Sequence, residues 1–260
     1  MFLNYDQEFI FNGQKLSGIS DVSFNAGLGV ALAKTLGARN YGFYKDGPAL
    51  GVLEFSRSLI YNDPVFSLTG NSPCSGQFSY GSIDYFFNSG YLNNYSVSCS
   101  VGQIPAVSAN FQIYGEMKSG DISPTVSAHP DIHVPSPRSI VIQNDYSSSN
   151  RATSLQYSVE CQRIPRYDFN SLFPTEISSI SPVKISAAIS FNVKGFSPID
   201  LQNFVRQVSS PTFNISIKVR TLSTTLMTLP VTNATLTSQQ IQGTVDSPIG
   251  VTLQYEGYSE

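Results

Sequence analysis

The stretch Lys184-Ile-Ser-Ala-Ala-Ile-Ser-Phe-Asn-Val193 alternates apolar residues with small or polar ones. A period of two places every second side chain on one face of a β-strand, whereas a helix needs a period near 3.6. Five further runs of this kind are residues 51–56, 95–101, 107–114, 213–219 and 250–255. The sequence therefore predicts an all-β fold with one or two short helices, whose sheets bury one face and turn the other toward water or a polar interface.

One segment departs from this period. Ser197-Pro198 is a suitable N-cap and first-turn pair, and four apolar residues follow it with the spacing of one helical face. These residues are Leu201, Phe204, Val205 and Val208. We therefore expect a helix over 198–208, packed on a sheet.

The stretch from Met117 to Thr153 is rich in proline and serine and ends in a polar run. This composition is typical of a connection between domains, with room for a short strand at 139–143. We expect a first β domain over 1–120, a linker over 121–153 and a second β domain over 154–260.

Prolines mark a repeated order of features in the two expected domains. Pro48 opens a strand that Pro64 closes 16 residues later, and Pro182 opens a strand that Pro198 closes after the same interval. The offset between the two pairs is 134 residues. Chance similarity between β-rich segments is the alternative to duplication.

Other strands fit the same order, at offsets that drift as small loop insertions would cause. The segment beginning at Asn94 matches the one beginning at Asn233, at an offset of 139, and the closing strands match at 142. The matched closing strands are 111–115 and 253–257, and the matched opening strands are 20–24 and 155–159. The shared order of strands, loops and prolines favours duplication.

Each half resembles the tail tube proteins of long-tailed bacteriophages and the related tube proteins of contractile injection machines. The shared pattern is an opening strand, a long loop, a proline-led strand, a turn or helix carrying Asp63-Pro64 or Pro198-Ile-Asp200, and a closing hairpin. The hairpin ends in Phe-Gln-Ile-Tyr-Gly115 or Leu-Gln-Tyr-Glu-Gly257. The matching regions are about 17–116 and 154–258.

This resemblance implies two tandem tail-tube-like domains, each a small β-sandwich or barrel with one flanking helix. Sheets joined around a ring would form a hollow tube, and the long loop would reach the next ring. The implied partners are copies of this chain, in trimeric pseudo-hexameric or hexameric rings, and other tail proteins: tape measure, tail terminator, baseplate or distal tail protein and, in contractile tails, a sheath. The implied location is the virion, after assembly in the host cytoplasm, with DNA passing through the lumen unbound.

Three other functions remain open at this point. A distal tail or baseplate ring protein would share the same domain type. A carbohydrate-binding or adhesin β-sandwich would use exposed aromatic residues, although the chain has no tryptophan. A hydrolase on a β scaffold is the fourth interpretation.

The charge of the chain argues against several classes of protein. Charged residues make up 13%, about half of the ~25% typical of soluble domains. The net charge is −3 without a basic block, so we expect neither dedicated nucleic-acid binding nor binding to an anionic membrane. The longest small-apolar stretch, 26–33, is too short to span a bilayer, and Asp6 and Glu8 carry the wrong charge for a signal peptide.

Residue patterns typical of catalysis or metal binding are weak. His129 and His133 have an H-x-x-x-H spacing, but Pro130 and Pro135 make a helix unfavourable there. There is no Gly-x-Ser-x-Gly elbow and no Gly-Lys-Ser/Thr phosphate loop, and the three cysteines lack metal-type spacing. We therefore expect no enzyme activity, no cofactor and no metal, and free buried thiols.

Two equivalent long loops place cations beside aromatic rings. Such groups could dock onto the acidic rim of a neighbouring subunit, or they could belong to ordinary solvated loops. The candidate residues for contacts between subunits or rings are Arg39, Tyr41, Lys45, Arg163, Arg166 and Tyr167.

Overall fold

The computed structural model describes most of the chain. The described residues are 9–16, 18–28, 31–33, 42–44, 49–59, 63–69, 72–80, 83–119, 140–144, 148–149, 152–169, 171–192, 213–220, 225–242 and 250–259. They form nineteen strands and one short 3-10 helix, η1 (Phe66–Thr69). The all-β expectation is confirmed, and each of the six strands read from the sequence is present.

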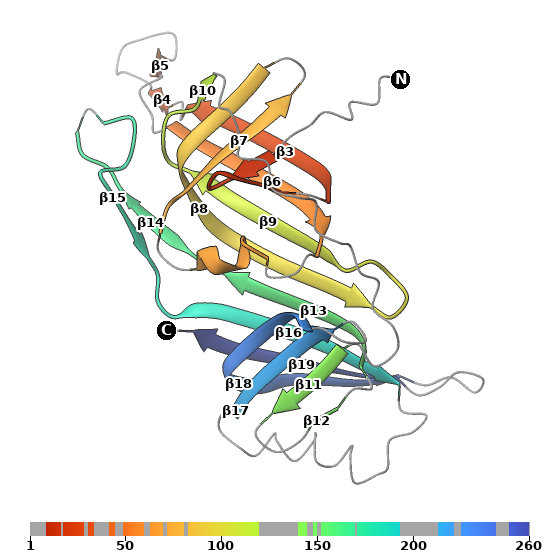
Figure 1. The fold of residues 1–260 in the computed structure, drawn as a ribbon. Coiled ribbons are helices and arrows are strands. Elements are labelled where there is room, and N and C mark those ends of the chain that lie inside the picture. The colour runs from red at the N-terminus through yellow and green to blue at the C-terminus, as the bar shows by residue number, and fades with distance from the viewer. Residues whose placement is uncertain are drawn as a thin grey trace.

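Eight strands lie side by side in one antiparallel path, which we call the long sheet (Figure 1). In spatial order they are β3 (Ile19–Leu28), β6 (Ala49–Ser58), β9 (Ala106–Ile113), β8 (Ile83–Ser100), β13 (Ala152–Glu160), β16 (Val183–Asn192), β19 (Gly250–Ser259) and β18 (Thr225–Gln242). The first four strands belong to the first half of the chain, residues 9–119, and the last four to the second half, residues 140–259.

A second layer covers one face of the long sheet in each half. In the first half it contains β7 (Cys74–Tyr80), β1 (Phe9–Phe11) and β2 (Gln14–Lys15). In the second half it contains β17 (Phe213–Arg220), β11 (Ile140–Asn144) and β12 (Ser148–Ser149). Both layers are continuous with the long sheet, because β8 and β18 each have 18 residues and use their first part to pair with β7 or β17.

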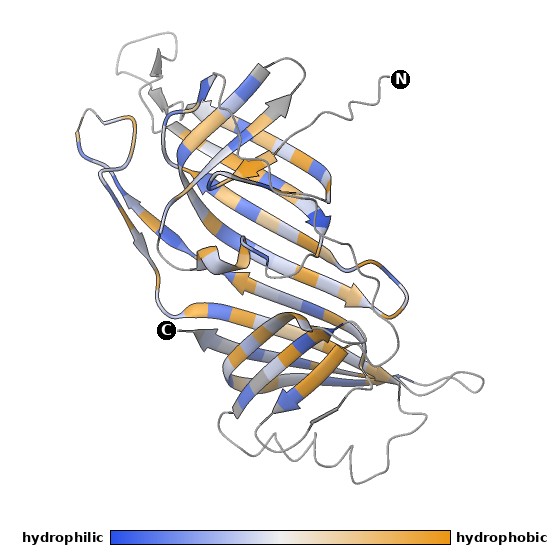
Figure 2. Ribbon diagram, viewed as in Figure 1, coloured by the Kyte–Doolittle hydropathy of each residue, from blue (hydrophilic) through white to orange (hydrophobic). Residues whose placement is uncertain are grey.

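Aromatic and aliphatic side chains fill the space between the layers. Phe9 and Phe11 of β1 lie over Phe55 of β6 and Phe111 of β9, with ring centroids 5.1 and 4.8 Å apart. The alternation that predicted the strands produces this core, and Figure 2 shows it as changes of colour along each strand of the long sheet. Burial of these rings, with the other apolar side chains of the core, stabilises the fold.

The remaining elements are hairpins and short additions. β4 (Ala31–Ala33) pairs with β5 (Gly42–Tyr44) between β3 and β6, and β14 (Arg163–Arg166) pairs with β15 (Glu176–Ser179) between β13 and β16. β10 (Lys118–Ser119) pairs with the first part of β8. The two hairpins therefore occupy equivalent places in the two halves.

The two halves repeat the same pairing order. The first half pairs β3-β6-β9-β8-β7-β1-β2, and the second pairs β13-β16-β19-β18-β17-β11-β12. Three bulges also coincide. They lie at Ile19/Asp21 and Ala152/Ser154, at Cys74/Gly76 and Phe213/Ile215, and at Leu92/Asn94 and Leu236/Ser238. Because bulges are defined features of a strand pair and not of composition, their coincidence supports duplication over chance similarity.

The bulges correct parts of the sequence alignment of the two halves. The offset of 134 between β6 and β16 is confirmed, since Arg57 and Phe191 occupy the same place beside the first bulge. The offset of 139 between the segments at Asn94 and Asn233 is wrong, because Asn94 corresponds to Ser238. The predicted matches of the closing strands and of the opening strands are each wrong by two residues. A shift by two residues keeps the same side chains on the buried face, so the alternation in the sequence could not reveal it.

The structure describes only part of the segment predicted to connect the halves. The strand expected at 139–143 is present as β11, and the rest of the predicted linker up to residue 139 lies outside the described residues. The helix expected over 198–208 also lies outside them. The two halves belong to one 15-stranded sheet because β8 pairs with β13, so the division into two separate domains stays a prediction.

A buried charged cluster fixes the region where the halves meet. Arg57 of β6 and Asp63 form an ion pair whose side chains are both fully buried. The Tyr95 hydroxyl donates to Asp63 Oδ2 at 3.1 Å and lies 3.8 Å from the sulfur of Met227, in the second half. Burial, together with the Asp63 charge, raises the pKa of Tyr95 well above its usual value, so its hydroxyl keeps the proton that it donates.

Candidate functional site: a polar sheet face and two open strand edges

The face of the long sheet away from the core is polar along all eight strands, and we call it the polar face. Directly paired residues share one side of a sheet, so the strand registers define its members. Its uncharged polar members include Ser23, Asn25, Ser56, Asn94, Ser96, Ser98, Ser108, Asn110, Gln156, Ser158, Ser186, Ser190, Ser238, Gln240, Gln242, Thr252 and Gln254. Most of them are serine or a side-chain amide, which explains why the sequence holds so few charges.

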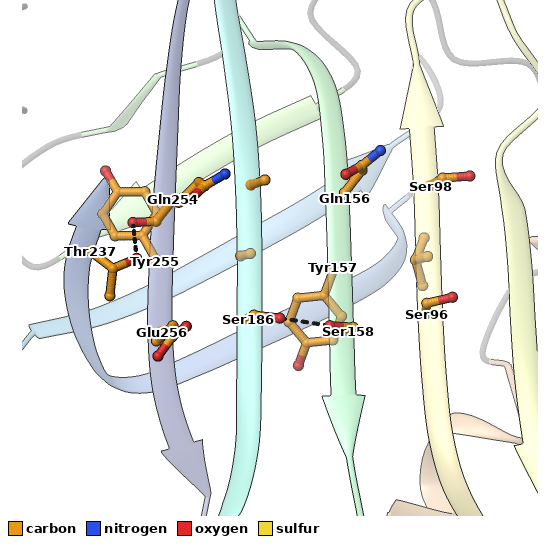
Figure 3. Close-up of a pocket in the computed structure, with 13 residues that line it drawn as sticks. Ser96, Ser98, Gln156, Tyr157, Ser158, Ser186, Thr237, Gln254, Tyr255 and Glu256 are labelled. Atoms are coloured by element: carbon orange, nitrogen blue, oxygen red, sulfur yellow. Dashed lines mark hydrogen bonds between the residues drawn. The ribbon is translucent and has the colours of Figure 1, made fainter. Parts of the chain in front are cut away.

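The polar face is hollowed where the two halves meet. An open groove of about 480 Å³ crosses β8, β13, β16 and β19. Figure 3 shows Ser96, Ser98, Gln156, Ser158 and Ser186 on neighbouring strands of this groove. The Ser158 and Ser186 hydroxyls lie 2.6 Å apart, so cross-strand hydrogen bonds link its floor. The groove is open to solvent and does not enclose a small molecule.

The charges on the polar face are mostly negative. Among the described residues it carries the carboxylates of Asp21, Glu54, Glu160 and Glu256 and the ammonium of Lys184. The Lys184 ammonium lies 3.5 Å from the Glu256 carboxylate, so the positive charge of Lys184 is locally offset. Phosphate backbones are bound chiefly through clusters of lysine and arginine. The described part of the polar face has no such cluster.

The contact between the halves is a regular antiparallel strand pair, which we call the internal joint. Ser96 pairs with Ser158 and Ser98 with Gln156, and the pairing runs from Asn94 to Ser100. Val97 and Tyr157 lie opposite each other on the core side, and their exposed fractions are 1% and 2%. The joint therefore hides two strand edges and an apolar pair.

The counterparts of these two edges have no strand beside them among the described residues. β3, the counterpart of β13, pairs only with β6 in the part of the chain that the structure describes. The end of β18, the counterpart of the end of β8, pairs only with β19 there. Ile241, the counterpart of Val97, is 58% exposed. β18 contains no charged residue and β3 contains one, Asp21, so neither edge has the lysines that protect free edges.

The predicted loop residues of the second half divide into two groups. Arg163 packs within the chain, with its Cζ 5.6 Å from the centre of the Tyr91 ring, and Tyr91 meets Tyr114 edge-on at 5.8 Å. Burial and the neighbouring Tyr167 raise the pKa of Tyr114, which places Tyr167 in the same cluster. These contacts hold the base of the β14–β15 hairpin against the first half.

Arg166 instead is exposed, and its guanidinium lies 3.6 Å from the Glu176 carboxylate across the hairpin. It is available for a contact with another subunit, and its role there stays a prediction. The candidates of the first loop, Arg39, Tyr41 and Lys45, lie outside the described residues.

The same hairpin exposes apolar side chains both at its base and in the loop beyond Arg166. Phe169 is fully exposed, at 103%, and Ile164, Leu172 and Ile180 are 56%, 45% and 40% exposed. Single exposed apolar residues are ordinary on a protein surface, whereas a group of them on one projecting hairpin is typical of a contact surface. Sequence reasoning selected the cations of this loop and missed its apolar residues.

Metal-binding side chains are not gathered anywhere in the described ranges. Within them no three His, Cys, Asp or Glu side chains lie close enough to hold a metal ion, and His129 and His133 fall outside them. Cys74, Cys99 and Cys161 are buried free thiols. Burial raises the pKa of Cys74 to about 12 and that of Cys99 to about 11, so these thiols are poor nucleophiles.

Comparison with known proteins adds no family assignment. No protein-family model matches this chain, and no curated protein matches it in sequence. In the described residues, none of the helical structure is long and apolar enough to cross a membrane.

Proposed function

We propose that this chain is a non-enzymatic structural subunit whose copies join edge to edge into rings. The observation that carries the proposal is the internal joint together with its two open counterparts on β3 and β18. A strand edge without a partner is an aggregation hazard unless another chain covers it. Two complementary edges on one subunit generate a closed ring when the rotation between copies closes.

The composition of the polar face supports the proposal that the ring serves as a conduit. A closed ring of long sheets has one face outside and one inside, and the core layer already occupies the side opposite the polar face. The polar face would therefore line the bore. Its serine, amide and carboxylate groups would let a polyanion pass without binding, because lysine and arginine are nearly absent from it.

These features fit the tail tube of a bacteriophage best. In that role the rings would stack, the β14–β15 hairpin with its exposed Phe169 would reach the next ring, and DNA would pass through the bore. The partners would be further copies of the chain and the other tail proteins, and the location would be the virion. A distal tail or baseplate ring would use the same joints without continued stacking.

Electron microscopy of the purified chain in negative stain tests the proposal. We expect rings with an open centre, and stacked rings or tubes if the chain forms a tail tube. Closed single rings would favour the distal tail or baseplate role. Monomers at all accessible concentrations would refute the proposal.

A matched pair of variants makes the test specific. Ile241→Lys places a charge on the open edge of β18 and should abolish rings. Ile104→Lys places the same charge at a residue of similar exposure, 53% against 58%, in the turn after β8, and should leave rings intact. Rings from both variants would show that the β18 edge is not used.

A further inference from the structure

We propose that β18 of one copy pairs with β3 of the next in one defined antiparallel register, which places Ile241 opposite Phe24. This inference rests on the proposed function and specifies its joint. The coincident bulges show which residues of the two halves correspond. Each residue of the internal joint can therefore be replaced by its counterpart in the other half, which gives the pairing expected between copies.

The transfer uses two offsets. Leu92 and Asn94 flank a bulge in β8 as Leu236 and Ser238 do in β18, so each residue of β8 corresponds to one in β18 that lies 144 positions later. Ile19 and Ala152 likewise begin equivalent bulges, so each residue of β3 corresponds to one in β13 that lies 133 positions later.

Each pair of the internal joint then predicts a pair between copies. Ser96 with Ser158 gives Gln240 with Asn25, and Val97 with Tyr157 gives Ile241 with Phe24. The pairs in which both residues are described are Ser238 with Gly27, Gln239 with Ala26, Gln240 with Asn25, Ile241 with Phe24, and Gln242 with Ser23.

The exposure of the unpaired residues agrees with this register. Val97 is 1% exposed beneath the internal joint, whereas its counterpart Ile241 is 58% exposed. Tyr157 is 2% exposed, whereas its counterpart Phe24 is only partly buried. In the proposed register the two incompletely buried side chains lie opposite each other on the core side, where their contact would remove apolar surface from water.

The direction and charge of the two edges also agree with this register. Adjacent strands from β3 to β18 are all antiparallel, so strand direction alternates along the long sheet. Because β3 is the first strand and β18 the eighth, β3 of the next copy would continue this alternation and lie antiparallel to β18. None of the residues of the five predicted pairs is charged. Asp21 of β3 corresponds to Ser154, in the last pair of the internal joint, so its carboxylate lies at the margin of the predicted pairing and not at its centre.

Disulfide formation between introduced cysteines tests the register. Asn25→Cys with Gln240→Cys should link copies under mild oxidation, because directly paired Cα atoms lie about 4.5–5.5 Å apart, within the range of a disulfide. Both positions are exposed, so the substitutions leave the core unchanged. Within one copy the two strands are about 34 Å apart along the sheet, so a disulfide must join two copies. The largest species on a denaturing gel counts the copies in a ring.

A displaced pair is the matched control. Ser23→Cys with Gln240→Cys is shifted by two residues on the same face, and its Cα atoms would lie about 7–8 Å apart, too far for efficient linkage. We expect at least about tenfold less linked product from this pair than from the aligned pair. The native cysteines give no background because they are buried.

The outcomes separate the register from the function. Efficient linkage of the aligned pair alone supports the register. Preferential linkage of the displaced pair, or rings seen by microscopy with linkage of neither pair, overturns the register and leaves the ring proposal standing. Absence of rings from the parent chain overturns the proposed function and the inference together.

Discussion

Removing the Ile241 side chain separates assembly from folding, because this residue is exposed in the single chain and would be buried only in the joint. Full burial of an isoleucine contributes about 1.5–3 kcal/mol. Ile241 is 58% exposed, whereas its counterpart Val97 is 1% exposed, so rather more than half of that value is still available on assembly. We expect Ile241→Ala to weaken each joint by about 1–1.5 kcal/mol, or about five- to fifteenfold in the dissociation constant.

Sedimentation velocity over a range of protein concentrations measures the association, and urea unfolding of the dissociated chain measures the fold. The free energy of unfolding should change by less than about 0.5 kcal/mol in Ile241→Ala, as for an ordinary surface substitution. Val97→Ala, at the buried counterpart, should instead cost about 2 kcal/mol of folding stability.

Ile104→Ala is the control for the loss of an exposed isoleucine, and it should alter neither association nor folding. Association that is unchanged in Ile241→Ala, while the parent chain still forms rings, would refute the assignment of this residue to the joint. A large loss of folding stability in Ile241→Ala would show that the side chain is already packed in the monomer.

Three further predictions concern the fold itself. Asp63→Ala should destabilise the chain by about 3–5 kcal/mol in urea unfolding, because it leaves the buried Arg57 charge without its partner, whereas replacing both residues by leucine or methionine should cost much less. Gly90→Ala should cost about 1–3 kcal/mol, because a Cβ there would lie 2.5 Å from the Phe87 ring. Stability should also fall above about pH 10, by up to about 1.4 kcal/mol per pH unit for each buried tyrosine, and Tyr157→Phe should reduce this slope.

Tyr157 shows why the fold loses stability at alkaline pH. Burial, with a smaller contribution from Cys161, raises the pKa of Tyr157, so the folded chain keeps a proton that the unfolded chain releases near pH 10. Its contribution is complete below that pH and declines as the pH rises toward the folded value. A slope that is unchanged in Tyr157→Phe would contradict this assignment.

The other two predictions have internal controls. Gly27→Ala should leave folding unchanged, because no atom lies within 4 Å of an added Cβ there. An Asp63→Ala variant as stable as the parent would show that Arg57 finds another partner or water.

Alternation made most of the fold predictable from the sequence. Residues 107–114 were read as a strand because every second side chain is apolar, and β9 spans Ala106–Ile113 with alternate residues buried. The same reasoning identified the order of elements in the two halves. It could not fix the register of the repeat, because displacements by two residues preserve the buried face, and only the bulges resolve them.

The last part of β18 was harder to recognise from the sequence for a different reason. This part, Thr235–Gln242, is almost entirely polar and exposed, so the sequence carries little of the apolar signal that identifies a strand. We attribute this to the open edge, since β8 at the equivalent place beside β13 alternates its polar residues with the buried Tyr95 and Val97. A strand completed by another copy is harder to recognise within one chain.

Arg57 was missed although the sequence contained a signal for it. In the run from Gly51 to Ser58, Leu53, Phe55 and Arg57 share the core-facing positions, so the alternation itself places a cation in the core. A buried cation requires a partner, and Asp63 follows six residues later, beside Pro64.

A cryo-electron microscopy map of the assembled chain tests the edge-to-edge claim most directly. We predict a ring in which the long sheets are continuous across every subunit boundary, with β18 beside β3 of the next copy and Ser96, Ser158 and Gln254 facing the bore. A ring whose copies meet through other surfaces, or whose polar face lies on the outside, would contradict the account.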